Sequence, residues 1–353
     1  MHGRRFSAAH YVRAANSGRR IYREAANHLK HALITGGSGV IGSNLSDALL
    51  ERGYEVTVID NLLTGRIQNI EHNLENPKFH LIHDTILNEP LMDELIKSAS
   101  VVYHLAAAVG VKHIVNDPLQ GILINVKGSE IVFAHAFKYW KRVVFASTSE
   151  IYGRSTDIPF KEDGLRVLGP TNVDRWSYST SKALDEHLAF AYHRKGLPVS
   201  IVRYFNAYGP RIDESGYGSV VANFISQAFR GEPLTVHGDG QQTRCFTFVG
   251  DTVRGTIAAG EHKAAIGQAF NIGNNKEITI LELAERIKKL TGTTADIKFI
   301  PYEKAYGKSY QDTRRRVPDV SKAQEMLGFR AEVDLDEGLA RTIAWAREHY
   351  EVN

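Results

Sequence analysis

The sequence has a single cysteine, Cys245, among its 353 residues. One thiol can form neither an intramolecular disulfide nor a cysteine metal cluster, and this favours a reducing, intracellular compartment. The fifteen histidines show no spacing typical of metal ligands, so we predict no metal site. No apolar run reaches the roughly 18 residues that a membrane-spanning helix needs. Together these absences predict a cytoplasmic protein that does not cross a membrane.

Acidic side chains are scarce in the first 31 residues, which carry seven lysines and arginines but only one acid, Glu24. The rest of the chain carries 36 basic and 39 acidic side chains, so its net charge has the opposite sign. A basic tail can contact nucleic acid or anionic lipid, and an arginine-rich, acid-poor composition is also like that of a transit peptide. We expect residues 1–31 to be an N-terminal extension without a catalytic role, and we expect no nucleic-acid partner.

From Ala32 onward, short apolar runs alternate with segments of helical spacing. The apolar runs are Ala32–Thr35, Glu55–Ile59, Phe79–Ile82, Val101–His104, Val143–Ala146, Val199–Arg203 and Ala269–Ile272. The clearest helical segments are Ile41–Arg52, Val220–Phe229, Ile280–Leu290 and Leu335–His349. The alternation predicts an α/β fold, a Rossmann-type doubly wound parallel sheet with helices on both faces. We assign this domain to residues 32–208 with a returning segment near 245–275, and a smaller α/β substrate lobe mainly to residues 209–353.

Three glycines follow the first apolar run at intervals of three: Gly36, Gly39 and Gly42. The first permits a tight turn, the second lets backbone approach a pyrophosphate, and the third permits close packing of helix on strand. Asp60 ends the second run, where a carboxylate accepts hydrogen bonds from both ribose hydroxyls of NAD and repels a 2′-phosphate. The strand, turn, helix and acid predict an NAD site rather than an NADP site, although the nearby Arg66 points the other way.

Tyr178 and Lys182 are four residues apart, which places them on one face of a helix. An ammonium beside a phenol favours the phenolate, and this gives a base that can deprotonate an alcohol near neutral pH. Thr148 could relay that proton, and Glu150 is a second, independent acid/base group. Two proton-handling centres predict chemistry beyond simple alcohol oxidation.

These motifs, taken in order, resemble the extended short-chain dehydrogenase/reductase family. The matching segments are the glycine turn, Asp60, His104-Leu-Ala-Ala107, Ser147-Thr-Ser-Glu-Ile-Tyr-Gly153, Tyr178-x-x-x-Lys182 and Arg203-Tyr-Phe-Asn206. The resemblance covers nearly all of residues 32–350. Members of the family are NAD-dependent sugar-nucleotide epimerases, dehydratases and decarboxylases, so the resemblance implies an NAD-dependent enzyme acting on a nucleotide sugar.

The resemblance also implies roles for individual residues. Thr148 and Tyr178 would deprotonate the sugar 4-hydroxyl, and Lys182 would hold the nicotinamide ribose. The residues that would bind NAD are Gly36, Gly39, Val40, Ile41, Gly42, Asp60, Asn61, Asp84, Thr85, Leu105, Ala106, Ala107, Asn125, Tyr178, Lys182 and Tyr204. Asn206, Asn223 and Arg244 would bind the nucleotide diphosphate, with Val236 beside the nucleobase. The segment 238–244 resembles that of uridine-nucleotide enzymes, so we expect a UDP-sugar substrate.

The reaction that follows oxidation at C4 depends on the residues near C5. In the family, a Thr-Ser-Glu run such as Thr148-Ser149-Glu150 occurs in GDP-mannose 4,6-dehydratases and UDP-glucuronate decarboxylases. The arginine run 314–316 resembles the substrate loop of the decarboxylases, in which Arg316 would bind the substrate carboxylate because a guanidinium matches it in bidentate geometry. UDP-glucuronate decarboxylation is therefore the first hypothesis. A UDP-glucose or UDP-glucuronate 4-epimerase, a 4,6-dehydratase and a dinucleotide-binding regulator without turnover remain alternatives.

Two helical segments also bear on assembly. In the family, the helix that carries Tyr178 and Lys182 and the helix near Ile122–Phe137 form a four-helix bundle with a second copy. The resemblance therefore implies a homodimer. Apolar stripes on both segments suit that bundle, and they suit packing on the sheet equally well.

Overall fold

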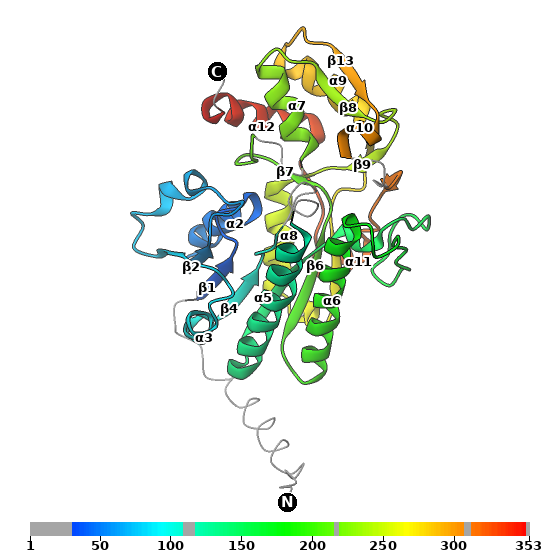
Figure 1. The fold of residues 1–353 in the computed structure, drawn as a ribbon. Helices are drawn as coiled ribbons and strands as arrows, with labels where there is room; N and C mark the ends of the chain where they lie inside the picture. The colour runs from blue at the N-terminus through cyan, green and yellow to red at the C-terminus, as the bar shows by residue number, and fades with distance from the viewer. Residues whose placement is uncertain (1–29, 109–116, 215–218, 307–311, 351–353) are drawn as a thin grey trace, which may run out of the picture.

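The computed structural model describes residues 30–108, 117–214, 219–306 and 312–350. The N-terminal extension expected at residues 1–31 therefore lies almost entirely outside the described residues. Seven strands form a parallel sheet at the centre of the molecule (Figure 1). Their order across the sheet is β11 (Ala269–Ile272), β6 (Val199–Tyr204), β5 (Arg142–Thr148), β4 (Val101–His104), β1 (His31–Thr35), β2 (Glu55–Asp60) and β3 (Phe79–His83).

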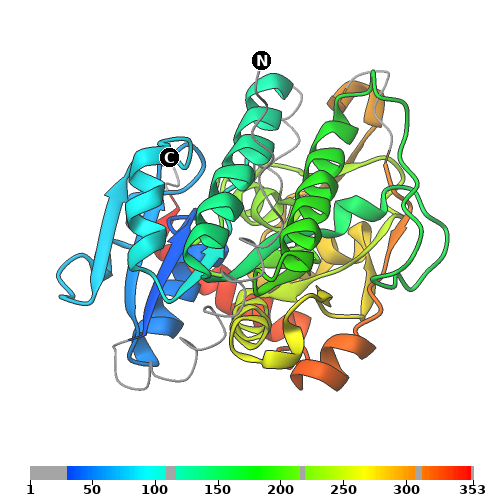
Figure 2. The same ribbon diagram turned by 90° about the horizontal axis from the view of Figure 1, so that it is seen from below.

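Helices cover both faces of this sheet (Figure 2). One face carries α3 (Glu89–Ser98), α5 (Pro118–Tyr139) and α6 (Arg175–Arg194), and the other carries α2 (Val40–Glu51), α8 (Val249–Glu261) and α11 (Ser321–Leu327). The strands are apolar along almost their whole length because both of their faces are buried. Val102, Phe133 and Phe145 are fully buried on the first side, and Leu45 and Val58 on the second.

A smaller lobe lies beyond the carboxyl ends of the strands (Figure 1). Its helices are α7 (Val220–Phe229), α9 (Ile280–Thr291), α10 (Tyr302–Tyr306) and α12 (Leu335–His349). Its strands are the pairs β8 (Leu234–His237) with β13 (Ile297–Ile300) and β7 (Ala207–Tyr208) with β10 (Thr247–Phe248), and the group of β12 (Glu277–Thr279), β9 (Thr243–Cys245) and β14 (Arg315–Arg316). Helix α9 begins at a capping box, in which Thr279 and Glu282 each bond the other's backbone N–H, and ends at left-handed Gly292.

The predicted α/β fold with a doubly wound parallel sheet is confirmed. Helices α7 and α12 have the predicted bounds, α2 begins one residue earlier than predicted, and α9 ends one residue later. The apolar run Ala269–Ile272 forms strand β11, which pairs with β6 at the edge of the large sheet although it follows most of the small lobe in sequence. Within the part of the chain that the structure describes, no helix has both the length and the hydrophobicity to span a membrane.

Candidate active site

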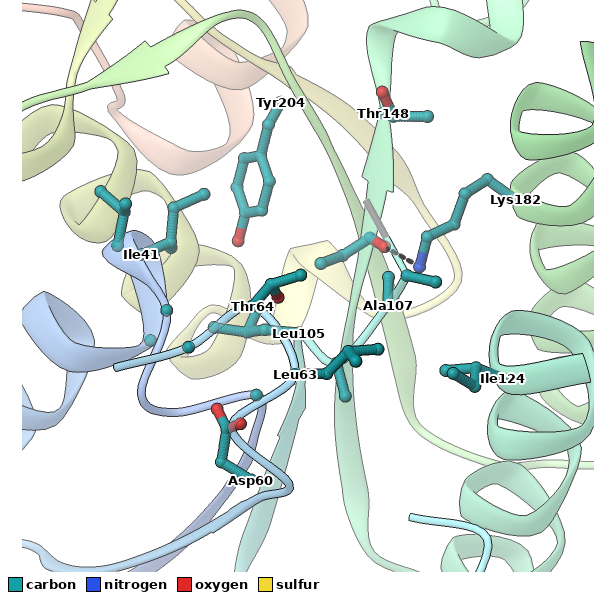
Figure 3. Close-up of a pocket in the computed structure, with 18 of the residues that line it drawn as sticks. Ile41, Asp60, Leu63, Thr64, Leu105, Ala107, Ile124, Thr148, Lys182 and Tyr204 are labelled. Carbon is teal, nitrogen blue, oxygen red and sulfur yellow. Dashed lines mark hydrogen bonds between the residues drawn. The ribbon is translucent and has the colours of Figure 1, made fainter. Parts of the chain in front are cut away.

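A cavity of about 420 Å³ opens at the carboxyl ends of the parallel strands. The strand order reverses between β4 and β1, because the chain moves outward in opposite directions from these two neighbours. Doubly wound sheets bind their ligands at such a reversal, since the loops that follow the two strands separate there. Figure 3 shows Asp60 at one end of this cavity and Thr148 and Lys182 at the other.

The glycine turn between β1 and α2 forms one wall of the cavity. Gly36 has φ +73°, and a Cβ on it would lie 2.8 Å from the backbone of Ala106, so only glycine fits there. A Cβ on Gly42 would collide with the carbonyl oxygen of Gly36. A Cβ on Gly39, by contrast, would meet nothing closer than 3.5 Å, because this backbone faces the cavity. An anion can therefore approach the backbone at the start of α2.

Asp60 and Asp84 bring two carboxylates to the same end of the cavity. The Asp60 oxygens accept hydrogen bonds from the backbone N–H groups of Ser38 and Leu62, both at 2.8 Å. Asp84 accepts from the N–H of Thr85 at 2.7 Å and from Asn88 at 2.8 Å, and these bonds lower the pKa of its carboxyl. Each oxygen keeps a lone pair for a further donor, so this end of the cavity suits a ribose with two hydroxyl groups.

Tyr178 and Thr148 face each other at the other end of the cavity. Burial raises the pKa of the Tyr178 phenol and the Glu150 carboxylate raises it further, whereas a hydrogen bond with the Thr148 side chain lowers it. The Thr148 oxygen also accepts from the N–H of Glu150 at 3.2 Å, which leaves the hydroxyl proton available for the phenol oxygen. The pair can therefore pass a proton between a bound alcohol, Tyr178 and Thr148.

Lys182 shares the cavity with Tyr178, and its ammonium contacts β5. Its Nζ donates to the carbonyl of Ala146 at 2.9 Å and lies 4.6 Å from the centre of the Phe145 ring, both on β5 (Figure 3). Burial lowers the pKa of this amine. The i and i+4 spacing places the two side chains in one cavity. The predicted influence of Lys182 on the Tyr178 pKa stays a prediction.

Glu150 lies among arginines that come from three different elements. Its carboxylate pairs with Arg316 of β14 at 2.8 Å and with Arg175 of α6 at 3.4 Å. Burial would raise the pKa of Glu150, but Arg316, Arg175 and Arg244 outweigh burial and lower the pKa to about 2. Glu150 is therefore ionised at neutral pH, so it can accept a proton here but cannot donate one. From the sequence alone, Glu150 could have been either a proton donor or a proton acceptor.

A second carboxylate, Asp312, completes this charged cluster. It pairs with Arg244 at 2.9 Å and with Arg175 at 3.7 Å. Three guanidinium groups therefore share two carboxylates, and the cluster carries one excess positive charge. Such an excess next to a cavity favours an anionic group on the ligand.

Known proteins match most of this chain. A protein-family model described as GDP-mannose 4,6 dehydratase matches residues 33–342. The chain is 44% identical over 319 residues to UDP-N-acetyl-alpha-D-glucosaminuronate decarboxylase of Bacillus cytotoxicus, covering 90% of this chain and 98% of that protein. The chain belongs to the NAD-dependent sugar epimerase/dehydratase family, the extended short-chain dehydrogenases/reductases.

Two further members of this family are similar in sequence or in structure. UDP-glucuronic acid decarboxylase 1 of Arabidopsis thaliana is 40% identical over 316 residues, which cover 88% of this chain and 68% of that protein. The crystal structure of UDP-glucuronic acid 4-epimerase from Bacillus cereus, in complex with UDP-glucuronic acid and NAD, superimposes with a TM-score of 0.82 at 30% identity. This match covers 91% of this chain and all of that one.

The cavity fits the NAD cofactor of the family. The open backbone at Gly39 suits a diphosphate, and the Asp60 carboxylate suits the adenosine ribose. The predicted residues that line the cavity are Gly36, Gly39, Val40, Ile41, Gly42, Asp60, Asn61, Asp84, Thr85, Leu105, Ala106, Ala107, Thr148, Ser149, Glu150, Tyr178, Lys182, Tyr204, Asn206 and Arg316. Asn206 has φ +40° and donates to the carbonyl of Cys245 at 2.9 Å, which joins the cavity to β9.

Four predicted site residues lie outside the cavity lining. Asn125 is buried behind the cavity, accepts from the N–H of Ala108 at 2.9 Å and donates to Ser181 at 3.2 Å, so it can steady the loop and α6. Asn223 is partly exposed on α7. Val236 is fully buried in strand β8. Arg244 is bound by Asp312 and two backbone carbonyls. The roles predicted for these four residues stay predictions.

Several residues at the site were not predicted from the sequence. Leu63, Thr64, Gly65 and Ile124 line the cavity, while Arg175 and Asp312 hold the charged cluster together. The segment 61–65 directly follows Asp60, so its proximity could have been inferred from the turn after β2. Arg175 precedes Tyr178 by three residues and therefore shares its helix face, so its place near the site could have been inferred from the sequence. No spacing of this kind relates Asp312 to another residue of the site.

A buried acid behind the site predicts a pH effect on stability. Asp185 is fully buried on α6, and burial raises the pKa of its carboxyl to about 6, against the opposing influence of Lys182. Because the pKa is raised in the fold, the contribution of Asp185 to stability is greatest below about pH 4 and is lost as the pH rises through about 6. The free energy of unfolding of Asp185→Asn, taken relative to that of the native protein, should rise by on the order of 2 kcal/mol from pH 4 to pH 7.

Urea denaturation at both pH values measures this gain, with Asp296→Asn as the control at an exposed aspartate. If the free energies of unfolding of the Asp185→Asn variant and the native protein differ by the same amount at both pH values, the prediction is contradicted.

Proposed function

We propose that this protein is an NAD-dependent UDP-glucuronate decarboxylase that forms a 4-keto intermediate. The observation that carries the proposal is the Glu150–Arg316 ion pair, which lies in the same cavity as Thr148 and Tyr178. A UDP-glucose 4-epimerase needs a proton relay at C4 but no group that binds a sugar carboxylate, whereas a UDP-glucuronate 4-epimerase would also use such a group. The similarity to two uronate decarboxylases over about 90% of the chain supports the same conclusion.

The first step needs a base at the 4-hydroxyl of the sugar. The Tyr178 phenolate accepts that proton and becomes a phenol, and the Thr148 hydroxyl stabilises the phenolate before the transfer, since the hydrogen bond between them favours the charged form. Bound NAD would supply the hydride acceptor that leaves a ketone at C4. Lys182 would hold the nicotinamide ribose, and its buried ammonium would favour the phenolate form of Tyr178.

The ketone makes the sugar a β-keto acid, in which the bond between C5 and C6 is weak. When this bond breaks, its electron pair moves to C5 and the ketone oxygen, CO₂ leaves, and the enolate then takes a proton at C5. Arg316 binds and orients the carboxylate before it leaves, in exchange for Glu150. Glu150 keeps Arg175 as a partner during that exchange, so neither Glu150 nor Arg316 is left without an opposite charge.

Product analysis tests the proposal against the main alternative. Incubation with UDP-glucuronate should release CO₂ and give a UDP-pentose or UDP-4-ketopentose, which mass spectrometry identifies. UDP-galacturonate with all six carbons retained would instead establish 4-epimerisation, the activity named for the similar Bacillus cereus structure. UDP-N-acetylglucosaminuronate belongs in the same panel, because the Bacillus cytotoxicus relative is named for that substrate.

We also propose a homodimer formed through α5 and α6, in the cytoplasm and without a nucleic-acid partner. The two helices pack side by side (Figure 1) and expose large apolar side chains. These are Leu119, Ile122 and Leu123 of α5 and Leu184 of α6, each at least 40% exposed. Pairing two copies of this surface would bury all four in a bundle.

Leu123→Glu should convert the dimer to a monomer, because a carboxylate cannot be buried without a partner at an apolar interface. Sedimentation velocity at micromolar concentration measures the change. Leu165→Glu is the matched control, since Leu165 is 76% exposed in a loop and not on these helices. A native protein that sediments only as a monomer would refute the dimer.

A further inference from the structure

Arg66 lies beside the end of the cavity that suits the adenosine ribose. Its backbone N–H donates to the carbonyl of Ser38 at 3.1 Å, and the N–H of Ser38 donates to Asp60 at 2.8 Å. Gly65, the preceding residue, lines the cavity, and a Cβ on it would lie 2.9 Å from an Asp60 oxygen. The backbone of Arg66 is therefore fixed close to the carboxylate that would read the ribose 2′-hydroxyl.

The guanidinium of Arg66 is bound by two acids on a distant loop. Its Nη2 lies 2.6 Å from Asp213 and its Nη1 lies 3.3 Å from Glu214. All three side chains are at most 40% exposed. One guanidinium is thus held by two carboxylates beside the ribose end of the cavity.

The loop that carries the two acids is itself anchored. Arg211 is in a left-handed conformation with φ +73°, and its guanidinium pairs with Asp47 of α2 at 2.6 Å. The hydroxyl of Tyr350 donates to the carbonyl of Ile212 at 3.0 Å. These bonds fix the backbone on the N-terminal side of Asp213 and Glu214, so the acids can hold Arg66 in place rather than follow it.

NAD and NADP differ by one phosphate at the adenosine 2′-oxygen. Enzymes that use NADP commonly meet this phosphate with an arginine near the end of the second strand, in bidentate geometry. Here such an arginine is present, but both of its terminal nitrogens already bind carboxylates. A 2′-phosphate would have to displace two acids from Arg66 while also approaching Asp60.

We propose that Asp213 and Glu214 are specificity-determining residues, which hold Arg66 away from a 2′-phosphate and so select NAD over NADP. Asp60 rejects the phosphate by direct repulsion, and the two acids remove the cation that could compensate for it. The selection would therefore have two independent parts on two different loops. This inference concerns cofactor choice and does not depend on which sugar nucleotide reacts.

Competition between the two cofactors tests the inference. Full-length protein is equilibrated with equal concentrations of NAD and NADP, passed through a desalting column, and its bound nucleotides are quantified by chromatography. The double variant Asp213→Asn/Glu214→Gln should raise the bound NADP/NAD ratio at least tenfold above that of the native protein. A third change, Arg66→Met, should return the ratio toward the native value, because the gain requires the released guanidinium.

The pattern across variants separates specificity from a merely structural role. If the ion pairs only fasten two loops together, the double variant would bind both cofactors more weakly and leave the ratio unchanged, which would overturn the inference. A raised ratio that persists after Arg66→Met would also overturn it. Glu261→Gln removes an acid from another arginine, Arg52, and is the control. Should the double variant fail to fold, Glu214→Gln alone gives the same test, with a smaller rise expected.

Discussion

Tyr178→Phe should reduce kcat for UDP-glucuronate by about a thousandfold, because the variant has no group that can take the proton from the sugar 4-hydroxyl. Binding should change little. The aromatic ring remains, and the glycine turn, Asp60 and Arg316 are untouched. Steady-state kinetics of CO₂ release measure the first effect, and calorimetric titration with the UDP-sugar measures the second.

Tyr139→Phe is the matched control for this variant. Tyr139 ends α5, and its hydroxyl bonds Asp93 outside the cavity, so the same chemical change should leave kcat within twofold. A Tyr178→Phe enzyme that keeps most of its turnover would show that another group removes the proton. If the native protein turns over none of the nucleotide sugars in the product panel, the result favours the non-enzyme alternative, a dinucleotide-binding regulator.

Glu150→Gln should lower kcat about a hundredfold and lower KM at the same time. The amide keeps the shape of Glu150 but removes the negative charge from Arg316 and Arg175. Arg316 would then bind the substrate carboxylate without competition, which favours the ground state. The variant would also lack an ionised acid beside Arg316, because Glu150 is the only acid paired with Arg316 within the described residues. A fall in both constants is the signature of ground-state binding that does not help the reaction.

Glu277→Gln is an instructive control for that experiment. Glu277 pairs with Arg315, the neighbour of Arg316 on β14, at 2.8 Å and outside the cavity. Each variant therefore removes one negative charge from the partner of an arginine of β14. The partner of Arg316 lies in the cavity, and the partner of Arg315 lies outside it. Thermal denaturation should be run on both, because breaking a partly buried ion pair also costs stability. Unchanged kcat in Glu150→Gln would make Glu150 an inert hydrogen-bonding residue and would weaken the case for decarboxylation.

The sheet and most of the cavity were predictable because their signals are local. Three glycines at fixed spacing, an acid at the end of the second strand and a Tyr-Lys pair each lie within a few residues. The doubly wound topology then brings the ends of the parallel strands together. Segment periodicity was sufficient to place α7 and α12 because their apolar faces are long and uninterrupted.

Side-chain directions were much less predictable. The spacing of Tyr178 and Lys182 fixes a shared helix face, but the carbonyl of Ala146 on β5 decides where the ammonium lies. The resemblance placed Arg316 near a substrate carboxylate and did not predict its pairing with Glu150, which depends on how β14 joins β9. Val236 is enclosed by the small lobe, and its place beside a nucleobase stays a prediction. Each of these outcomes depends on contacts between distant segments.

The three consecutive arginines 314–316 pair with three different acids: Asp239, Glu277 and Glu150. Successive side chains of a strand point to opposite faces, so a shift of β14 by one residue would exchange the inward and outward positions. In most strands that error would replace a functional group with an unrelated one. Here a shift that brings Arg315 into the place of Arg316 still presents a guanidinium to Glu150, whereas the opposite shift would present Val317. Repetition therefore gives the site tolerance to an insertion of one or two residues in the segment leading to β14, where a single arginine would have been lost.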